Sequence, residues 1–337
     1  MKEPAMVKQT ENPLISIVTT SYSLDRLQDI ESLLDSIKAQ TYPQVELVFV
    51  TEGSEELFHQ VGALIRDEGL HNSRVLVSTN EPGADAARNL GISSAQGEIV
   101  AIVDDDVVLF PDWAEEMVKT YRDNNVVGVT GSISPLWEDS SMSWFPDEFS
   151  WMWGGTLWCD WHKGDEVREI RNVSGANCSF KKEAVEKVGG YLTPLGGYRG
   201  KDEKSTWYRG GGEEVELSLR VRQKTGKQIV FNPRVKVYHR VHRFRLSWGW
   251  IAHKAFAMGY CKHMVEALYP HCGGKPTLGQ EYNLLRHIFT RLIPSIAKKF
   301  FTNPVIAWRQ LSLTVIGVLF TGIGYAAYFF KPLKPRV

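Results

Sequence analysis

The stretch EIVAIVDDDVVLFPDW, residues 98–113, decides the fold. Its apolar run predicts a buried strand over Glu98–Val103 that stops at Asp104, Asp105 and Asp106. Open α/β sheets bind ligands outside the carboxyl ends of their strands, so these carboxylates stand where a substrate would lie. Hard oxygen ligands at such an edge suit Mg²⁺ or Mn²⁺, which often takes further ligands from phosphate. The stretch therefore predicts a metal-bridged nucleotide diphosphate; a solvated acidic turn is the alternative.

Strand and helix patterns alternate on both sides of this stretch. Further strands are expected at Ile15–Thr20, Val45–Val50, Arg74–Ser78 and Val126–Thr130, and helices at Asp25–Ala39, Ala84–Ala95 and Pro111–Tyr121. Such alternation predicts an α/β fold, Rossmann-like, with a mostly parallel central sheet and flanking helices on both faces.

Composition narrows the function classes. The chain has 337 residues, and its 39 Lys and Arg balance its 39 Asp and Glu, so no global charge indicates nucleic-acid binding. No G-x-G-x-x-G follows the first expected strand, which disfavours an NAD-type site. Residues 1–13 carry no apolar run of signal-peptide length, so we expect the chain not to be secreted.

The C-terminal region has the pattern of a membrane protein. Leu311–Phe330 contains 20 residues without a charge, which is enough for a helix to cross a bilayer. A buried helix, or a re-entrant helix bent at Gly322 and Gly324, is the alternative. Arg286–Phe301 mixes apolar and basic residues, which is typical of a helix lying in an anionic headgroup layer on the cytoplasmic face.

Two adjacent glutamates, Glu213 and Glu214, follow three glycines and open a predicted helix. Carboxylates at a helix N-terminus are favoured by the helix dipole, which is a purely structural explanation. A carboxylate there can also deprotonate an acceptor hydroxyl while a metal ion stabilises a departing diphosphate.

Aromatic and basic clusters provide candidates for acceptor binding. Six of the 11 tryptophans lie between Trp137 and Trp161, and among them Trp151 and Trp153 can stack on a sugar or pack in the core. The glycine-rich loop Gly196–Gly212 is expected to be a mobile flap. A basic cluster, which can grip a phosphate or lie on anionic lipid, consists of His239, Arg240, His242, Arg243 and Arg245. His239 is in addition a candidate metal ligand.

Four ordered motifs resemble the family 2 glycosyltransferases, inverting enzymes with the GT-A fold. They are Ser16–Val50, Asn80–Asp106, Ser174–Tyr191 and Gly211–Arg222. The resemblance covers about residues 14–245 and implies a metal-dependent transfer of sugar from a nucleotide-sugar.

Residue roles follow from this resemblance. Asp104 and Asp106 match the family's DxD pair, which contacts the ribose and the metal-diphosphate, and we expect Asp105 on the donor side with them. Glu214 matches the catalytic base, although the family usually has Asp there, and Glu213 is the lesser candidate. The remaining donor-site positions are Thr20, Tyr22 and Arg88, together with Thr51 or Glu52 where many members carry two acidic residues.

The segment Val237–Val265 looks like the corresponding part of archaeal transferases of the family that extend dolichyl-phosphate glycans with hexoses or hexuronates for protein glycosylation. The Q-x-x-R-W signature of processive synthases is absent from the sequence, so one sugar per encounter is expected. The predicted enzyme moves a sugar from a UDP-sugar to a polyprenyl- or dolichyl-linked saccharide at the cytoplasmic membrane surface. Alternatives are a transferase acting directly on polyprenyl phosphate and a non-catalytic nucleotide-binding membrane scaffold.

The expected organisation has five parts. They are an N-terminal tail (1–13), the GT-A domain (14–245), interfacial amphipathic helices (246–305), a transmembrane or re-entrant helix (306–331) and a basic tail (332–337).

Overall fold

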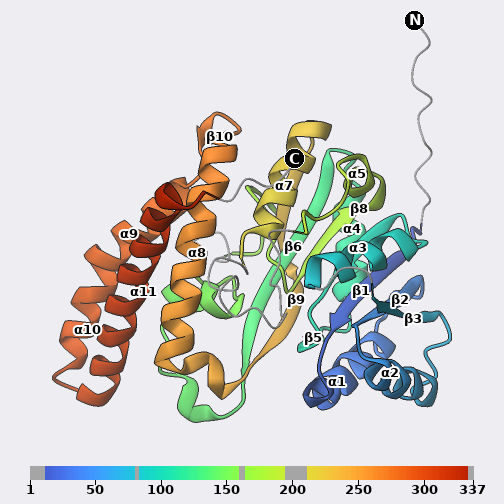
Figure 1. Ribbon diagram of the computed structural model, residues 1–337, viewed down its shortest axis with the longest axis horizontal. Coiled ribbons are helices and arrows are strands. Elements are labelled where there is room, and N and C mark those ends of the chain that lie inside the picture. Colours follow the sequence, from blue (N-terminus) through green and yellow to red (C-terminus); the bar gives the residue numbers. More distant parts are fainter. Residues whose placement is uncertain (1–11, 80–82, 159–163, 194–210, 333–337) are drawn as a thin grey trace, which may run out of the picture.

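A nine-stranded sheet lies at the centre of the protein in a computed structural model, which describes residues 12–79, 83–158, 164–193 and 211–332 (Figure 1). The strand order is β3-β2-β1-β4-β8-β6-β9-β5, with β7 paired to β9. The strands are β1 (Ile15–Ser21), β2 (Val45–Glu52), β3 (Ser73–Ser78), β4 (Ile99–Ile102), β5 (Val107–Leu109), β6 (Val126–Trp137), β7 (Arg168–Ile170), β8 (Cys178–Lys181) and β9 (Gln228–Val241).

Most strands of this sheet run in one direction. β1 pairs in parallel with β2 and β4, β2 with β3, and β6 with β9. β8 runs antiparallel to both β4 and β6, so β6 and β9 share the direction of β4. β5 and β7 are antiparallel to β9. The prediction of a mostly parallel sheet is confirmed, and the three reversed strands β5, β7 and β8 were not predicted.

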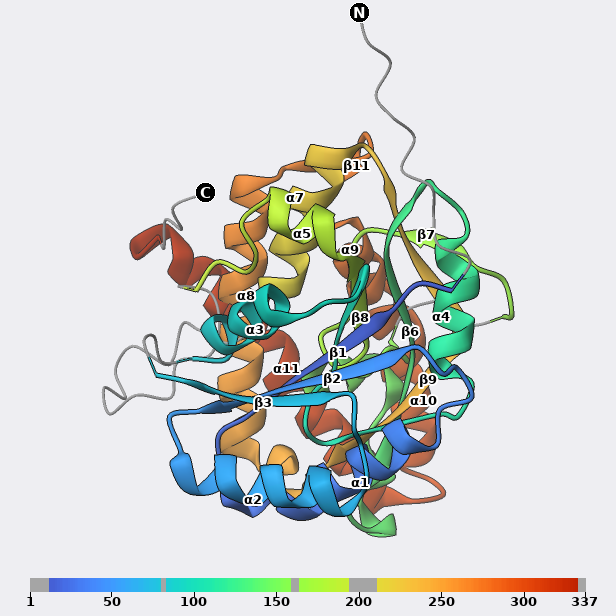
Figure 2. The same ribbon diagram turned by 90° about the vertical axis from the view of Figure 1, so that its right-hand side faces the viewer.

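Helices cover both faces of the sheet, as predicted (Figure 2). Ile15 and Ile17 of β1 face one core with Ile30 of α1, whereas Val18 faces the other with Ala87 of α3, because successive side chains of a strand point to opposite faces. The first face carries α1 (Leu27–Lys38), α2 (Glu55–Asp67) and α4 (Trp113–Tyr121), and the second carries α3 (Ala84–Ser94), α5 (Lys182–Lys187) and α7 (Glu213–Thr225).

Short 3-10 helices connect several of these elements. They are η1 (Leu24–Arg26), η2 (Ser140–Met142), η3 (Asp147–Trp153) and η5 (Arg243–Leu246).

The acidic triplet sits where the sheet edge was expected. β4 ends at Ile102, and Asp104–Asp106 fill the turn before β5, which returns along β9. The helix predicted from Pro111 begins at Trp113, and Asp112 is its N-cap. The strand predicted at Val126–Thr130 continues to Trp137 because it pairs with β9 along its length.

A layer of C-terminal helices packs beside the sheet, at the left of Figure 1. Its two long helices touch through backbone: a Cβ on Gly259 would lie 2.0 Å from the Thr321 carbonyl oxygen, and one on Gly324 equally close to that of Phe256. The layer consists of α8 (Trp248–Leu268), the hairpin β10 (His271–Cys272) and β11 (Lys275–Pro276), α9 (Gly279–His287), the π-helical turn η6 (Ile288–Leu292), α10 (Ile293–Lys299) and α11 (Pro304–Phe330).

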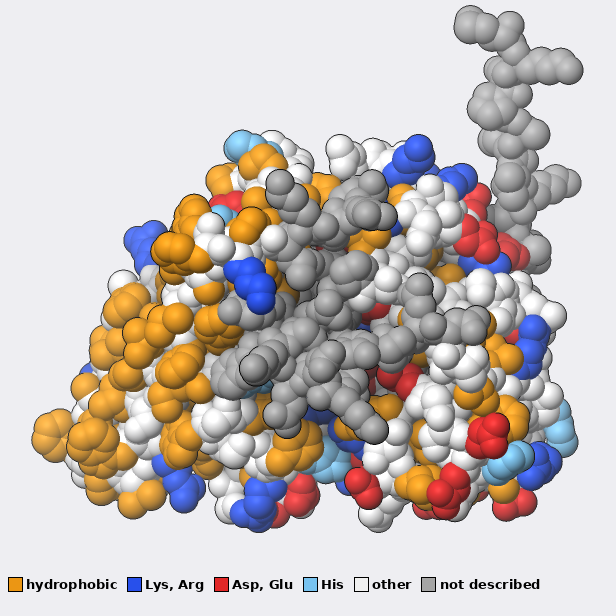
Figure 3. Space-filling model, viewed as in Figure 1, with side chains coloured by type: hydrophobic (Ala, Val, Ile, Leu, Met, Phe, Trp, Pro, Cys, Tyr) orange, Lys and Arg blue, Asp and Glu red, His pale blue; other side chains and the backbone are white. Residues whose placement is uncertain are grey.

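The outer surface of this layer is apolar (Figure 3). α11 is long and apolar enough to cross a membrane, and only 22% of its most apolar window is buried. It continues as one α-helix through Gly322 and Gly324. Its exposed apolar side chains include Trp308, Val315, Leu319, Ile323 and Phe330, and Phe289 and Phe301 extend the surface along η6 and past α10.

Candidate active site

The three aspartates at the sheet edge have different surroundings. The Asp104 side chain is 36% exposed, whereas that of Asp106 is 2% exposed. Asp105 is buried and accepts a hydrogen bond from the Ser21 hydroxyl. Burial and the neighbouring charge of Asp106 raise the pKa of Asp105 to about 7. Asp104 is therefore the member of the triplet that is most open to a ligand.

Asp106 is surrounded by two arginines and a histidine. Its carboxylate is 3.0 Å from Arg26, 2.8 Å from Arg245 and 2.9 Å from His239. Burial alone would raise the pKa of Asp106, but His239 and Arg245 hold it well below its ordinary value. Arg26 was missed in the sequence, although its position just after the first strand places it at this same edge. Asp106 is thus ionised and fixed in place.

Asp104, Asp106 and His239 together fit a divalent cation. Each offers a ligand atom, and these atoms lie within 4.8 Å of one another. Oδ1 of Asp106 is buried without a hydrogen-bond donor among the described residues, and Nε2 of His239, 2.9 Å away, accepts from Arg245. Two acceptors so close need a cation or a proton between them. Oxygen and imidazole ligands in this arrangement suit Mn²⁺ or Mg²⁺.

Arg88, on α3, joins the aspartates to the two glutamates. Its guanidinium is 3.5 Å from Asp104, 3.6 Å from Glu213 and 3.5 Å from Glu214, and it donates to Asp85 at 3.1 Å. Burial alone would lower the pKa of Arg88, but Glu214 and the other carboxylates raise it well above its ordinary value. The aspartates of the triplet and the glutamate pair therefore belong to one electrostatic site.

The glutamate pair occupies the first turn of α7. Gly212 is the N-cap with φ of 98°, a backbone conformation that favours glycine. The side chains of Glu213 and Glu214 are 12% and 14% exposed. Burial and the charge of Glu213 raise the pKa of Glu214 to about 8. A Cβ on Gly175 would lie 2.6 Å from Oε1 of Glu214, so only glycine leaves room for that carboxylate.

The expected donor residues differ in accessibility. Thr20 and Glu52 are partly exposed and Tyr22 is 38% exposed. Thr51 is fully buried, and its hydroxyl donates to the Leu76 carbonyl. β2 continues through Thr51 and is buried on both faces there, so of the two residues expected to meet the nucleotide base Glu52 has the more accessible side chain. Burial raises the pKa of Glu52 above its ordinary value, and the charge of Arg88 offsets only part of that rise. Glu52 remains the better-placed of the two.

Two of the five residues of the basic cluster contact an acidic residue that the sequence did not single out. Arg240 and His242 both contact the buried Asp29 of α1, at 2.7 Å and 2.9 Å. Both side chains remain partly exposed, at 26% and 23%, and their expected contact with a phosphate stays a prediction. Arg243 is exposed and pairs with Asp139, and Arg245 contacts Asp106.

The tryptophans expected at the acceptor divide between core and cavity. Trp153 is 3% exposed, and its ring lies 5.8 Å from that of Trp137 and 6.4 Å from that of His239. It packs in the core, which is one of the two roles considered for it in the sequence. Trp151 is partly buried and lines an apolar cavity. The loop Gly196–Gly212 falls largely outside the described residues.

Residues 16–189, which carry β1, the acidic triplet, Arg88 and Gly175, match the family described as "Glycosyl transferase family 2" over more than half of the chain. The chain belongs to glycosyl transferase family 2. It is accordingly a nucleotide-sugar-dependent glycosyltransferase, and the predicted family is confirmed.

Relatives agree with this assignment. The chain is 30% identical over 327 residues to the glucosyl-dolichyl phosphate glucuronosyltransferase of Haloferax volcanii, covering 96% of this chain and 97% of that one. Its fold resembles that of a mannosyltransferase from Pyrobaculum calidifontis solved in complex with GDP-Man and Mn²⁺, with a TM-score of 0.62, 19% identity and coverage of 99% and 92%. A glycosyltransferase solved with UDP, GalNAc and Mn²⁺ is similar with a TM-score of 0.53 and 16% identity, covering 88% of this chain and 58% of that one. The predicted GT-A fold is confirmed.

Proposed function

We propose that this family 2 enzyme is a membrane-anchored inverting glycosyltransferase that moves one sugar from a UDP-sugar to a polyprenyl-linked saccharide. The observation that carries the proposal is the placement of Arg88, whose guanidinium lies at 3.5 Å from both Asp104 and Glu214. A residue that holds a donor, and one that activates an acceptor, must face the same anomeric carbon, and Arg88 joins the two.

The donor half consists of the acidic triplet and its neighbours. Asp104, Asp106 and His239 would hold Mn²⁺ or Mg²⁺, which neutralises charge on the diphosphate when bound. The two solved neighbours are complexes with Mn²⁺, which supports a metal of this kind in the fold. His239, Arg245 and Arg26 keep Asp106 ionised, and Glu52 would meet the nucleotide base.

The acceptor half is Glu214. Its carboxylate takes the proton of the acceptor hydroxyl as the hydroxyl oxygen attacks the anomeric carbon. The bond from that carbon to the diphosphate oxygen breaks, UDP leaves with the electron pair, and the configuration inverts in a single displacement. A pKa raised to about 8 suits a base that must accept a proton near neutral pH.

The name of the Haloferax volcanii relative, a glucuronosyltransferase acting on glucosyl-dolichyl phosphate, supports a lipid-linked saccharide acceptor and a hexose or hexuronate donor. The apolar helix α11 and the exposed apolar side chains of α9–α11 support a membrane setting. We place the catalytic domain, residues 14–245, on the cytoplasmic face. The helices of 246–305 would lie at the interface and 306–331 would form the anchor.

Product analysis tests this function. Membranes containing the enzyme are supplied with labelled UDP-glucose, UDP-glucuronate or UDP-N-acetylglucosamine and with either glucosyl polyprenyl phosphate or bare polyprenyl phosphate. We expect label in the lipid extract only with the saccharide-bearing acceptor, as a disaccharide of inverted linkage, and its loss on chelation by EDTA. Transfer to bare polyprenyl phosphate, giving a single acid-labile sugar phosphodiester, would identify the rival reaction. Release of no nucleotide from any donor would identify a non-catalytic scaffold.

A further inference from the structure

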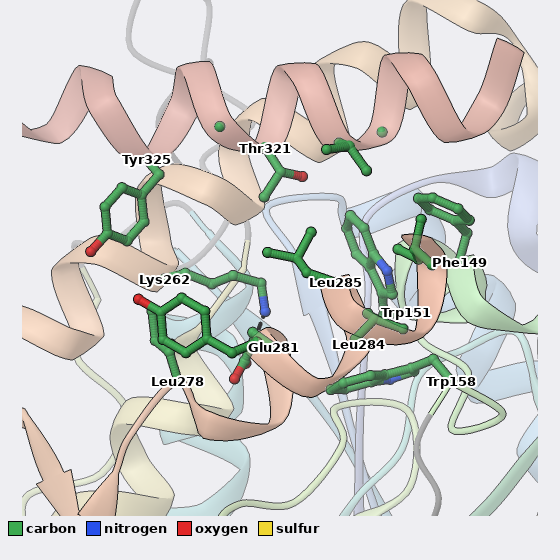
Figure 4. Close-up of a pocket in the computed structure, with 15 residues that line it drawn as sticks. Phe149, Trp151, Trp158, Lys262, Leu278, Glu281, Leu284, Leu285, Thr321 and Tyr325 are labelled. Carbon is green, nitrogen blue, oxygen red and sulfur yellow. Dashed lines mark hydrogen bonds and ion pairs between the residues drawn. The ribbon is translucent and has the colours of Figure 1, made fainter. Parts of the chain in front are cut away.

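An apolar cavity of about 300 Å³ lies between η3, α8, α9 and α11, away from the acidic site (Figure 4). Its buried wall includes Phe149, Leu278 and Ile288, which are 1%, 4% and 2% exposed. Small-molecule sites have volumes of roughly 300–1,000 Å³, so the cavity has room for part of a molecule of lipid size. Apolar cavities of this kind stay dry and take apolar ligands.

The mouth of the cavity opens on the apolar surface of the C-terminal layer. Tyr282 and Leu285 of α9 line the cavity and are 56% and 38% exposed. Gly322 of α11 also lines the cavity and is exposed. A Cβ on Gly322 would meet no atom within 4 Å, so this part of the helix faces open space. The surface around the mouth is the one that α11 would present to a bilayer. A ligand would therefore enter from the lipid side.

One corner of the cavity is polar and lies against α8, whose other side contacts the residue before the glutamate pair. Lys262 of α8 contacts Glu281 at 2.9 Å, and Arg171 forms two hydrogen bonds with the same carboxylate, at 2.9 Å and 3.0 Å. The residue before Lys262 is Cys261, whose Cβ lies 3.2 Å from where a Cβ on Gly212 would be. α8 thus separates the cavity from the first turn of α7 by the thickness of one helix.

We propose that this cavity binds a segment of the polyprenyl chain of the lipid-linked acceptor and so sets where that lipid lies relative to Glu214. The proposal rests on the proposed function. A nucleotide or sugar does not fit walls that are almost wholly apolar, because its polar groups would lose their hydrogen bonds to water. The polyprenyl chain would enter the cavity from the bilayer. One end of the bound segment would lie at the polar corner beside α8, which is the side toward the glutamates.

Photolabelling tests the cavity without requiring turnover. The enzyme is reconstituted in phosphatidylcholine vesicles with a diazirine-bearing polyprenyl phosphate, and labelled peptides are mapped. We expect label on α9 and α11 around the cavity. Gly322→Leu, which fills the open space, should lower that labelling about tenfold, corresponding to roughly 1.4 kcal/mol. Ala326→Leu, which adds apolar bulk at an exposed position of α11 outside the cavity, should label like the parent.

A diazirine-bearing phosphatidylcholine provides the second arm. Equal labelling of the cavity by both probes would mean that bilayer acyl chains fill it, and no labelling there by the polyprenyl probe would mean that the chain lies elsewhere. Either result overturns the proposal.

Kinetics separate the cavity from the reaction. With glucosyl polyprenyl phosphate, Gly322→Leu should raise KM about tenfold with little change in kcat, and KM for a single-isoprene analogue should stay at the parental value. If the parent enzyme transfers sugar to the long acceptor and Gly322→Leu leaves KM unchanged, polyprenyl binding in the cavity is refuted and the proposed function stands. If the polyprenyl probe labels α9 and α11 but the protein transfers no sugar, polyprenyl binding in the cavity stands and the proposed function is refuted.

Discussion

Replacing Glu214 by Gln is the sharpest test of the catalytic site. The amide keeps the shape of the side chain beside Gly175 but cannot accept the hydroxyl proton. Removal of a general base costs about 10²–10⁴-fold in rate, which is about 2.7–5.4 kcal/mol at 1.36 kcal/mol per tenfold. We expect kcat to fall by that factor in Glu214→Gln, with the KM for the UDP-sugar within about threefold of the parent because the donor contacts lie on other elements.

The matched control is Glu213→Gln, which changes an adjacent carboxylate at almost the same distance from Arg88. It should reduce kcat by less than about tenfold, since its loss lowers the pKa of Glu214 without removing the base. In the parent, kcat/KM should rise with pH and level off above a pKa near 8, and this limb should vanish in Glu214→Gln. The reasoning fails if Glu214→Gln keeps kcat within a few-fold of the parent, or if Glu213→Gln is the more damaging change.

Three further predictions concern the metal, the helix layer and the buried charge. Asp104→Asn should weaken Mn²⁺-dependent UDP binding at least about tenfold by calorimetry, whereas Asp112→Asn, at an exposed position, should not; equal binding by both variants would exclude Asp104 from the donor site. Gly259→Ala should destabilise the protein by about 1–3 kcal/mol in thermal unfolding, because its Cβ would meet α11 backbone, whereas Gly62→Ala has space on α2; an unchanged Tm for Gly259→Ala would contradict the close helix contact. Glu214→Gln should gain Tm over the parent as pH rises from about 5 to 8, because a raised folded-state pKa means that ionising Glu214 costs stability in this window; a difference independent of pH would show that the pKa is ordinary.

The elements that the sequence predicted well are those whose burial pattern is local. β1, α1 and β2 each bury one face or both, so period and composition located them within a few residues. α2 was overlooked although Leu57, Val61 and Ile65 recur at helical spacing and are buried. β9 was overlooked because Asn232 and Pro233 interrupt its apolar run, and pairing with β6, β5 and β7 keeps it extended.

The site shows where such reasoning stops. The acidic triplet and the glutamate pair stand in short motifs, and the fold brings them together through Arg88. Pairing across the chain is invisible in the sequence: Asp29 engages His242, 213 positions later, and Arg26 engages Asp106. Trp151 and Trp153 are two residues apart and have similar neighbours in the sequence. Only three-dimensional packing buries Trp153 in the core and leaves Trp151 at the wall of a cavity.

The contact of Gly259 with the α11 backbone has a mechanical consequence. Two helices in backbone contact cannot slide or tilt independently without a steric clash. We therefore expect α8 and α11 to move together as one rigid unit. On another side of α8, Met258 and Cys261 contact Gly211 and Gly212, which immediately precede the glutamate pair. In the proposed enzyme, we expect the depth and tilt that a bilayer of given thickness imposes on α11 to change the position of Glu214. Turnover in this enzyme should depend on the lipid in which it sits as well as on the substrates supplied to it.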